Sequence, residues 1–229
     1  MLFNPAALVP LKSAISTLEP LFAARKLFIA LVKLALNPLD SCVAPAEAST
    51  PKLLTYGVAP TSGTLVTKNR GDDPNELAHR YAKFINLVVA QKPAGMTLAM
   101  HLCRGNFRST HAASGNYEPV AEALLQEMNI DAYFMEHDDD RSGDFKPLRY
   151  LPKGKTVVLG LVTTKFGAME NKDDLKRRID EAARYAPIEQ LALSPQCGFS
   201  STVHGNDTAV KAQRAKLRLV IETAQEVWG

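Results

Sequence analysis

The run Thr156–Val162 constrains the fold of this chain most strongly, because it is almost entirely apolar and rich in β-branched residues. A strand with one solvated face alternates polar and apolar residues. A continuous apolar run of this length instead indicates a strand that is buried on both faces. Such strands are typical of parallel sheets covered by helices, so the run predicts a parallel α/β fold.

Strand and helix patterns alternate on either side of this run. Asp73 followed by Pro74 is typical of a helix start, and the apolar residues after it recur at helical spacing. We expect further strands within 97–103, 130–136 and 191–193, and further helices over 116–129, 171–185 and 208–228. In the last of these helices, the residues expected to face the core are Leu217, Val220, Ile221, Ala224 and Val227.

Four residues with metal-binding side chains follow or end these strands. His101 and Cys103 are two positions apart, so they point to the same side of their strand. Glu136 and Cys197 each come at or just after a short apolar run. The carboxyl ends of parallel strands meet at one edge of a sheet or barrel, and thiolate, imidazole and carboxylate groups are zinc ligands. We therefore predict a Zn²⁺ site made by these four residues.

Other charged residues surround this predicted site and leave alternatives open. Asp138, Asp139 and Asp140 compete with Glu136 for the role of the acidic ligand. The guanidinium groups near the strand ends can hold a carboxylate, sulfonate or phosphate of a substrate, or can form surface ion pairs with the aspartates. The predicted substrate-binding residues are Arg104, Arg108 and Arg141.

Composition narrows the classes of function. A formal net charge of +3 over 229 residues, with basic and acidic residues interleaved, argues against a nucleic-acid partner. Three cysteines provide no disulfide framework, and thiols beside ligand-type residues are typical of a reducing compartment. We therefore expect a cytoplasmic protein that acts on small molecules.

The first 70 residues differ from the rest of the chain. The segment Leu21–Leu36 is apolar, but Arg25, Lys26 and Lys33 interrupt it, so we predict no integral membrane span. It can be an amphipathic helix at a membrane surface, a targeting peptide or a helix that covers the core. The expected organisation is a helical extension over 1–50, a linker over 51–70, and the metal-binding domain over 71–229.

At the ligand residues the chain resembles the C-terminal half of the cobalamin-independent methionine synthase family, within the uroporphyrinogen decarboxylase-like barrels. The resemblance covers about 71–229 and rests on the order and spacing of His101, Cys103, Glu136 and Cys197. It implies a (β/α)₈ TIM-type barrel, of which this chain supplies only the later strands. It also implies that zinc activates a substrate thiol as a nucleophile for transfer of a methyl or other alkyl group from a donor.

Two departures from the family pattern bear on function. Lys165 stands where the synthases carry a histidine proton donor, and a lysine is ordinarily a poor acid at neutral pH. We expect Lys165 to act in catalysis by holding an anion. The earlier half of the barrel has no counterpart in residues 1–70, so exposed strand edges predict self-association into a homo-oligomer.

The sequence thus leads to two hypotheses. The favoured one is zinc-dependent alkyl transfer to a thiol, in which Glu136 is the ligand that the incoming thiol displaces. The alternative is a catalytically inactive barrel fragment that acts as a binding or regulatory module and holds at most a structural zinc.

Overall fold

The computed structural model describes residues 73–229, apart from 104–105, 107–108, 111–114 and 201–204. Its centre is a parallel sheet in the order β1-β2-β3-β4. The strands are Ala99–Leu102 (β1), Ala132–Glu136 (β2), Thr156–Val162 (β3) and Leu191–Pro195 (β4). Each strand pairs with its predecessor in the sequence, as consecutive strands of a (β/α) barrel do. The predicted parallel α/β class is confirmed.

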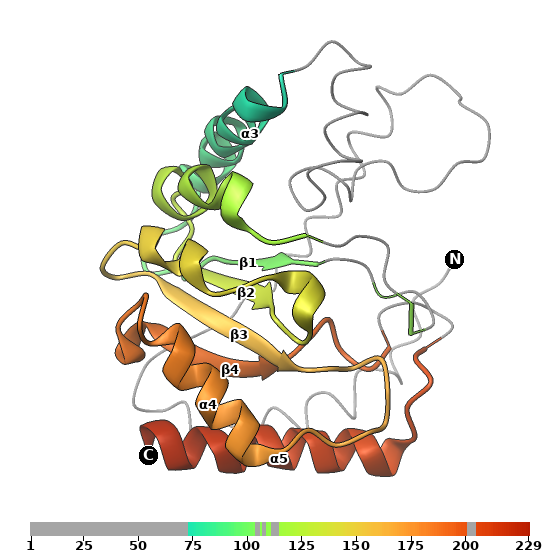
Figure 1. Ribbon diagram of the computed structural model, residues 1–229. Coiled ribbons are helices and arrows are strands. Elements are labelled where there is room, and N and C mark those ends of the chain that lie inside the picture. The colour runs from blue at the N-terminus through green and yellow to red at the C-terminus, as the bar shows by residue number, and fades with distance from the viewer. Residues whose placement is uncertain (1–72, 104–105, 107–108, 111–114, 201–204) are drawn as a thin grey trace, which may run out of the picture.

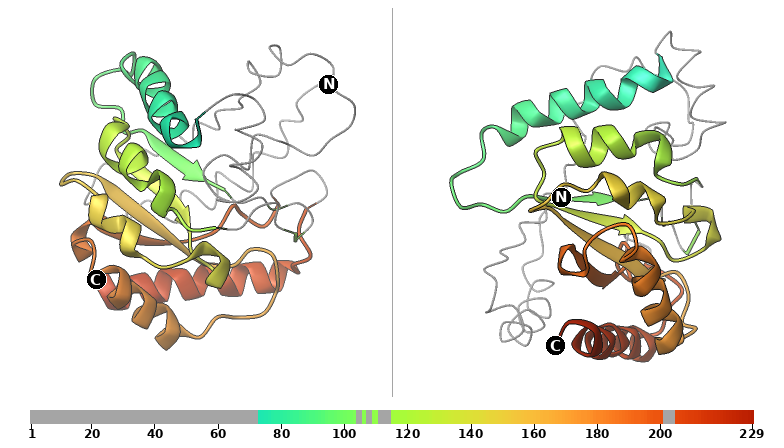
Figure 2. Two further views of the ribbon diagram at one scale, coloured as in Figure 1. Left: turned by 45° about the horizontal axis from the view of Figure 1, so that its top comes forward. Right: turned by 60° about the vertical axis from the view of Figure 1, so that its left-hand side comes forward.

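Helical segments connect the strands and lie in a row beside the sheet, from α3 at one end to α5 at the other (Figures 1 and 2). The α-helices are α3 (Pro74–Val89), α4 (Lys172–Ala182) and α5 (Val210–Trp228). Between β1 and β3 the chain instead forms short helical turns. These are η3 (Glu118–Val120), η4 (Ala123–Glu127), η5 (Asp140–Ser142) and η6 (Lys146–Tyr150), and a further turn, η7 (Ile188–Gln190), precedes β4.

Local chemistry explains where the first helices begin. The Asp73 carboxylate accepts a hydrogen bond from the backbone N–H of Asn75 at 2.9 Å, and Pro74 occupies the first turn. This is the start that the sequence predicts for α3. Asn171 caps α4 in the same way, because its side-chain oxygen accepts from the backbone N–H groups of Asp173 and Asp174.

The two faces of the sheet have different surroundings. The Tyr133 hydroxyl donates to the carbonyl of Leu124 in η4 at 2.6 Å, so Tyr133 faces the helices. Side chains alternate along a strand, which directs Phe134 and Glu136 to the opposite face. His101 pairs in register with Phe134 and shares that face. His101 and Glu136 therefore lie on the side of the sheet away from the helices, which is the inner side in a barrel.

The helix predicted over 116–129 is wrong in form, but most of the residues expected on its core face are buried. The chain makes a 3₁₀ turn at Glu118–Val120 and a π-helical turn at Ala123–Glu127 instead of one α-helix. Leu124, Leu125 and Met128 are nonetheless buried in the core, as their spacing predicts, whereas Val120, expected on the same face, is only partly buried.

The predicted core face of the last helix is wrong in part. The buried residues of α5 are Lys216, Leu219 and Thr223, whereas Leu217 is 45% exposed. Val220 and Val227 still pack partly against the core. The Lys216 ammonium group pairs with the carboxylate of Glu170, a contact that apolar spacing alone does not reveal.

The predicted extension over 1–50 and linker over 51–70 lie outside the described residues. Among the helices that the structure does describe, none is long and apolar enough to cross a membrane.

A glycine allows β3 to pass close to the end of β2. Gly160 pairs in register with Glu136, and a Cβ atom at position 160 would lie 3.1 Å from the carbonyl oxygen of Met135 and 3.4 Å from the Cα of Glu136. Backbone atoms inside a sheet cannot move away as easily as the end of a flexible side chain. Gly160 therefore fixes the spacing of the two strands beside a candidate ligand.

We predict that Gly160→Ala lowers the free energy of unfolding by about 1–3 kcal/mol, the usual range for an overpacked core. Urea denaturation measures this change.

Gly167→Ala is the matched control, because a Cβ there would meet only the Ala212 Cβ at an ordinary 3.5 Å. Equal stability of the Gly160→Ala and Gly167→Ala proteins would show that the close approach of β2 and β3 is unimportant.

Candidate metal centre

The four predicted ligands come together at the carboxyl edge of the sheet. His101 lies in β1 and Cys103 directly follows it, Glu136 is the last residue of β2, and Cys197 lies two residues beyond β4. Because the strands are parallel, all three chain segments emerge on the same side. One ligand atom from each of the four residues lies within 4.8 Å of the other three.

The individual distances show a compact cluster. The sulfur atoms of Cys103 and Cys197 are 3.0 Å apart, and the Cys197 thiol donates to Glu136 Oε1 at 2.5 Å. The His101 Nε2 atom lies 3.6 Å from the same carboxylate oxygen. Glu136 is buried, whereas His101 remains accessible from one side. The cluster is thus anchored on a buried acid and open toward His101.

This donor set fits a zinc ion. Four ligands at about 2.0–2.3 Å from zinc, arranged tetrahedrally, lie about 3.3–3.8 Å from one another. The observed separations bracket that range, so accommodating the ion would require side-chain movements of about an ångström. Two sulfurs, one imidazole nitrogen and one carboxylate oxygen also match the ligand preferences of zinc.

Contacts among the four side chains shift the pKa values of His101 and Cys197. Burial favours the neutral imidazole of His101, but hydrogen bonds and charge attraction from Cys103 and Glu136 outweigh it and raise the pKa of His101 to about 9. The hydrogen bond to Cys103, burial and the nearby Glu136 charge raise the pKa of the Cys197 thiol. Without a metal, both groups therefore hold their protons at neutral pH.

Tyr117 holds the ends of β1 and β2 together, a role that sequence reasoning missed. Its buried hydroxyl accepts from the backbone N–H of Glu136 at 2.9 Å and lies 3.3 Å from the carbonyl oxygens of Leu102 and Glu136. It thus fixes the backbone beside two candidate ligands. No motif marks this tyrosine, which stands in the connection between the two strands.

Lys165 lies beside the cluster but is not open to solvent. Its side chain is 3% exposed, and its Nζ atom donates to Gln196 Oε1 at 2.7 Å. The carboxylate of Asp138 lies 3.4 Å from the same nitrogen. Burial raises the pKa of Asp138, while the Lys165 charge opposes that shift. Gln196 directly precedes Cys197, so Lys165 contacts the ligand segment itself, a link that the sequence does not reveal.

The structure describes the three predicted substrate-binding arginines only in part. Arg104 and Arg108 lie outside the described residues. The backbone of Arg141 forms part of η5, just beyond β2, and its side chain is not described. Their predicted role in substrate binding stays a prediction.

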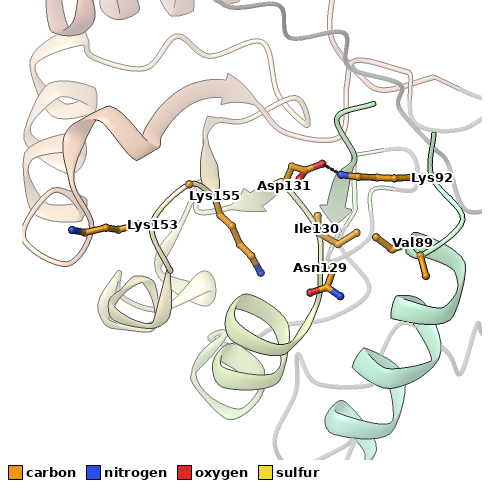
Figure 3. A pocket seen from close by; sticks show the side chains of 9 residues that line it. Val89, Lys92, Asn129, Ile130, Asp131, Lys153 and Lys155 are labelled. Carbon is orange, nitrogen blue, oxygen red and sulfur yellow. Dashed lines mark hydrogen bonds and ion pairs between the residues drawn. The ribbon is translucent and has the colours of Figure 1, made fainter. Parts of the chain in front are cut away.

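A pocket lies at the opposite edge of the sheet (Figure 3). It lies near the starts of β2 and β3, and two of its lysines already have partners. Lys92 pairs with Asp131 at 2.5 Å, and Lys155 donates to the carbonyl of Leu125 at 2.7 Å. These bonds connect loops to the sheet and leave neither ammonium group without an acceptor.

Comparison with known proteins assigns the family. The family model described as "Cobalamin-independent synthase, Catalytic domain" matches residues 62–226. The chain belongs to the cobalamin-independent synthase family. Among curated proteins of Bacillus subtilis (strain 168), "Uncharacterized protein YxjH" is 53% identical over 167 residues and "Uncharacterized protein YxjG" is 52% identical over 159. The matches cover 72% and 69% of this chain but 44% and 42% of those proteins.

Solved structures of synthases share the fold. A Listeria monocytogenes protein described as "Putative Vitamin-B12 Independent Methionine Synthase" matches with a TM-score of 0.57 and 31% identity, over 78% of this chain and 46% of that one. A B12-independent methionine synthase from Shewanella sp. W3-18-1, in complex with selenomethionine, matches with a TM-score of 0.51 and 19% identity, over 66% and 46%. The chain thus spans under half the length of these relatives and forms part of a TIM-type barrel.

The proton equilibria of the cluster predict that zinc binds more tightly as pH rises. Zinc must displace the protons of His101 and Cys197, so removing those protons removes a competitor. Between pH 6.5 and about 9, the affinity of the metal-stripped protein for zinc should rise by at least about tenfold per pH unit. Competition with a chromophoric chelator measures this.

Cysteine variants provide the control for that titration. Cys103→Ser and Cys197→Ser should each lose most of the zinc, whereas Cys42→Ser, which replaces the third cysteine, should keep it. Zinc affinity that is constant with pH, or unaffected by all three substitutions, would contradict the assigned ligands.

Proposed function

We propose that this chain provides the zinc centre for transfer of a methyl or other alkyl group to a small-molecule thiol. The observation that carries the proposal is the convergence of His101, Cys103, Glu136 and Cys197 from three strands within 4.8 Å. Family membership supports the same class of chemistry. Bound zinc would supply Lewis-acid activation, which lowers the pKa of a coordinated thiol and makes it a thiolate nucleophile.

Glu136 is the ligand proposed to give way to the substrate. Four protein ligands leave no open position, and a carboxylate oxygen is a weaker zinc ligand than a thiolate. Tyr117 holds the backbone of Glu136 through a 2.9 Å hydrogen bond, so the carboxylate can turn aside without moving the strand. His101 and the two cysteines then keep their places while the thiol enters.

Lys165 is proposed to act as a fixed positive charge. Its ammonium group lies between Gln196 Oε1 and the Asp138 carboxylate and is almost fully enclosed. Two thiolates, one carboxylate and an incoming substrate thiolate together carry more negative charge than zinc neutralises. A buried cation beside Cys197 would offset part of that excess. Arg104, Arg108 and Arg141 are proposed to hold an anionic group of the thiol substrate or the alkyl donor.

A second candidate function is a binding or regulatory module with at most a structural zinc. One observation favours it: the Lys165 ammonium group is already paired with internal partners, Gln196 and Asp138. The two functions differ in one respect that can be measured. Only the catalytic centre must admit a sulfur atom from outside the protein.

Thiol binding to the zinc-loaded protein tests the proposal. At saturating homocysteine, or another small thiol, X-ray absorption at the zinc edge should show one additional sulfur neighbour and one fewer oxygen. Glu136→Gln should admit the thiol more readily, because a neutral amide is a weaker ligand than a carboxylate.

The matched control is the corresponding alcohol, which should leave the zinc spectrum unchanged. A protein that binds about one zinc per chain yet shows no added sulfur would instead have the structural function.

Two replacements test the role of Lys165: arginine keeps the positive charge, and histidine can lose it near neutral pH. Lys165→Arg should retain several-fold more thiol affinity than Lys165→His, because arginine stays charged at every pH of interest. Isothermal titration of the zinc-loaded variants with the thiol measures this. Activity that depends on one group near neutral pH, lost in the arginine variant and kept in the histidine variant, would make residue 165 a proton donor instead.

A further inference from the structure

We propose that Lys216 and Glu170 are positioning residues for the candidate metal centre. They form an ion pair, in which the lysine is buried and the glutamate partly buried, that fixes the segment after β3 and, through Thr163 and Gln196, fixes the place of Cys197. The inference rests on the proposed function, because it concerns the same site.

The first contact is an ion pair between α5 and the loop that follows β3. The Lys216 side chain is 0% exposed, and its Nζ atom lies 2.8 Å from both carboxylate oxygens of Glu170. α5 packs against β4 and α4, so this loop is tied to a helix that is itself held on the sheet (Figure 1). Glu170 belongs to the connection between β3 and α4.

The second contact passes from Glu170 to the end of β3. Glu170 Oε1, one of the two oxygens bonded to Lys216, also accepts from the backbone N–H of Thr163 at 2.9 Å. Thr163 is the first residue after β3. One carboxylate oxygen therefore fixes the point at which the chain leaves the sheet toward Lys165.

The third set of contacts reaches the ligand segment. Thr163 Oγ1 donates to Gln196 Oε1 at 3.2 Å, and Lys165 Nζ donates to the same oxygen at 2.7 Å. The backbone N–H of Gln196 donates to the carbonyl of Val162 at 3.0 Å. Gln196 is thus held at both its backbone and its side chain. Cys197 is the next residue, and its sulfur contacts Cys103 and Glu136.

The ion pair is better suited to fixing geometry than to adding stability. A buried pair often contributes no more stability than apolar side chains of the same size, because both charges must leave water. Its specific effect is directional, since one carboxylate must point at both Lys216 and Thr163. Partners that orient metal ligands commonly change metal affinity by ten- to a hundredfold when they are lost.

The test uses the full chain, stripped of metal, in three variants. Lys216→Met removes the ammonium, and Glu170→Gln keeps an acceptor for the Thr163 N–H while it removes the charge. Lys172→Met is the matched control, because Lys172 joins α4 to α5 through Glu222 and Glu226 but has no contact with Thr163 or Gln196 among the described residues. Co²⁺ serves as the spectroscopic probe.

We expect Lys216→Met and Glu170→Gln to weaken Co²⁺ binding by roughly tenfold and to shift its visible absorption bands. Lys172→Met should match the wild type in both. In the metal-free proteins, alkylation of Cys197 followed by mass spectrometry should be several-fold faster in the first two variants, with Cys103 changed less.

The possible results distinguish a failure of the positioning role from a failure of the proposed function. Wild-type affinity, spectrum and alkylation rate in a folded Lys216→Met or Glu170→Gln protein would overturn the inference. If Lys216→Met does not fold, Glu170→Gln decides alone. If the wild type binds neither Co²⁺ nor Zn²⁺, the proposed function fails, and the alkylation rates still show whether the ion pair positions Cys197.

Discussion

The burial of the Glu136 carboxylate is the constraint on which the arrangement of side chains at the carboxyl edge of the sheet depends. Removing a carboxylate from water costs on the order of several kcal/mol unless other groups stabilise it. Among the described residues, the groups that stabilise it include the Cys197 thiol at 2.5 Å and the His101 ring at 3.6 Å. Those same groups are metal-ligand types. Side chains that would surround an ion therefore also help to stabilise the buried acid in the metal-free protein.

Lysine side chains near the starts of the strands and near their ends have different surroundings. At the starts of the strands, Lys155 donates to a backbone carbonyl and Lys92 pairs with Asp131, which holds connections in place. At the strand ends, Lys165 and Lys216 are almost fully buried, and each bonds to a side chain that leads toward Cys197. Charge at the first edge supports the fold, whereas charge at the second is arranged around the proposed site.

The chain corresponds to only part of the solved structures that it matches. The Listeria synthase shares the fold over 78% of this chain, but the match covers only 46% of that structure. A barrel site draws residues from the ends of many strands. The four candidate ligands all come from strands present here, so the proposed metal centre draws its four protein ligands from this part of the barrel.

The sequence by itself predicted a parallel α/β sheet and grouped the four candidate ligands. Strand periodicity is local, and parallel strands bring their ends to one edge, so His101, Cys103, Glu136 and Cys197 could be grouped from spacing and family resemblance. Only the tertiary structure decided that Lys165 faces Gln196, that Tyr117 ties β1 to β2, and that α5 buries Lys216 while Leu217 is exposed. These features depend on partners far away in the chain, such as Glu170 for Lys216, 46 residues apart. Apolar periodicity predicts that a lysine lies at the surface. Here the carboxylate of Glu170, distant in the sequence, pairs with Lys216 and allows it to be buried.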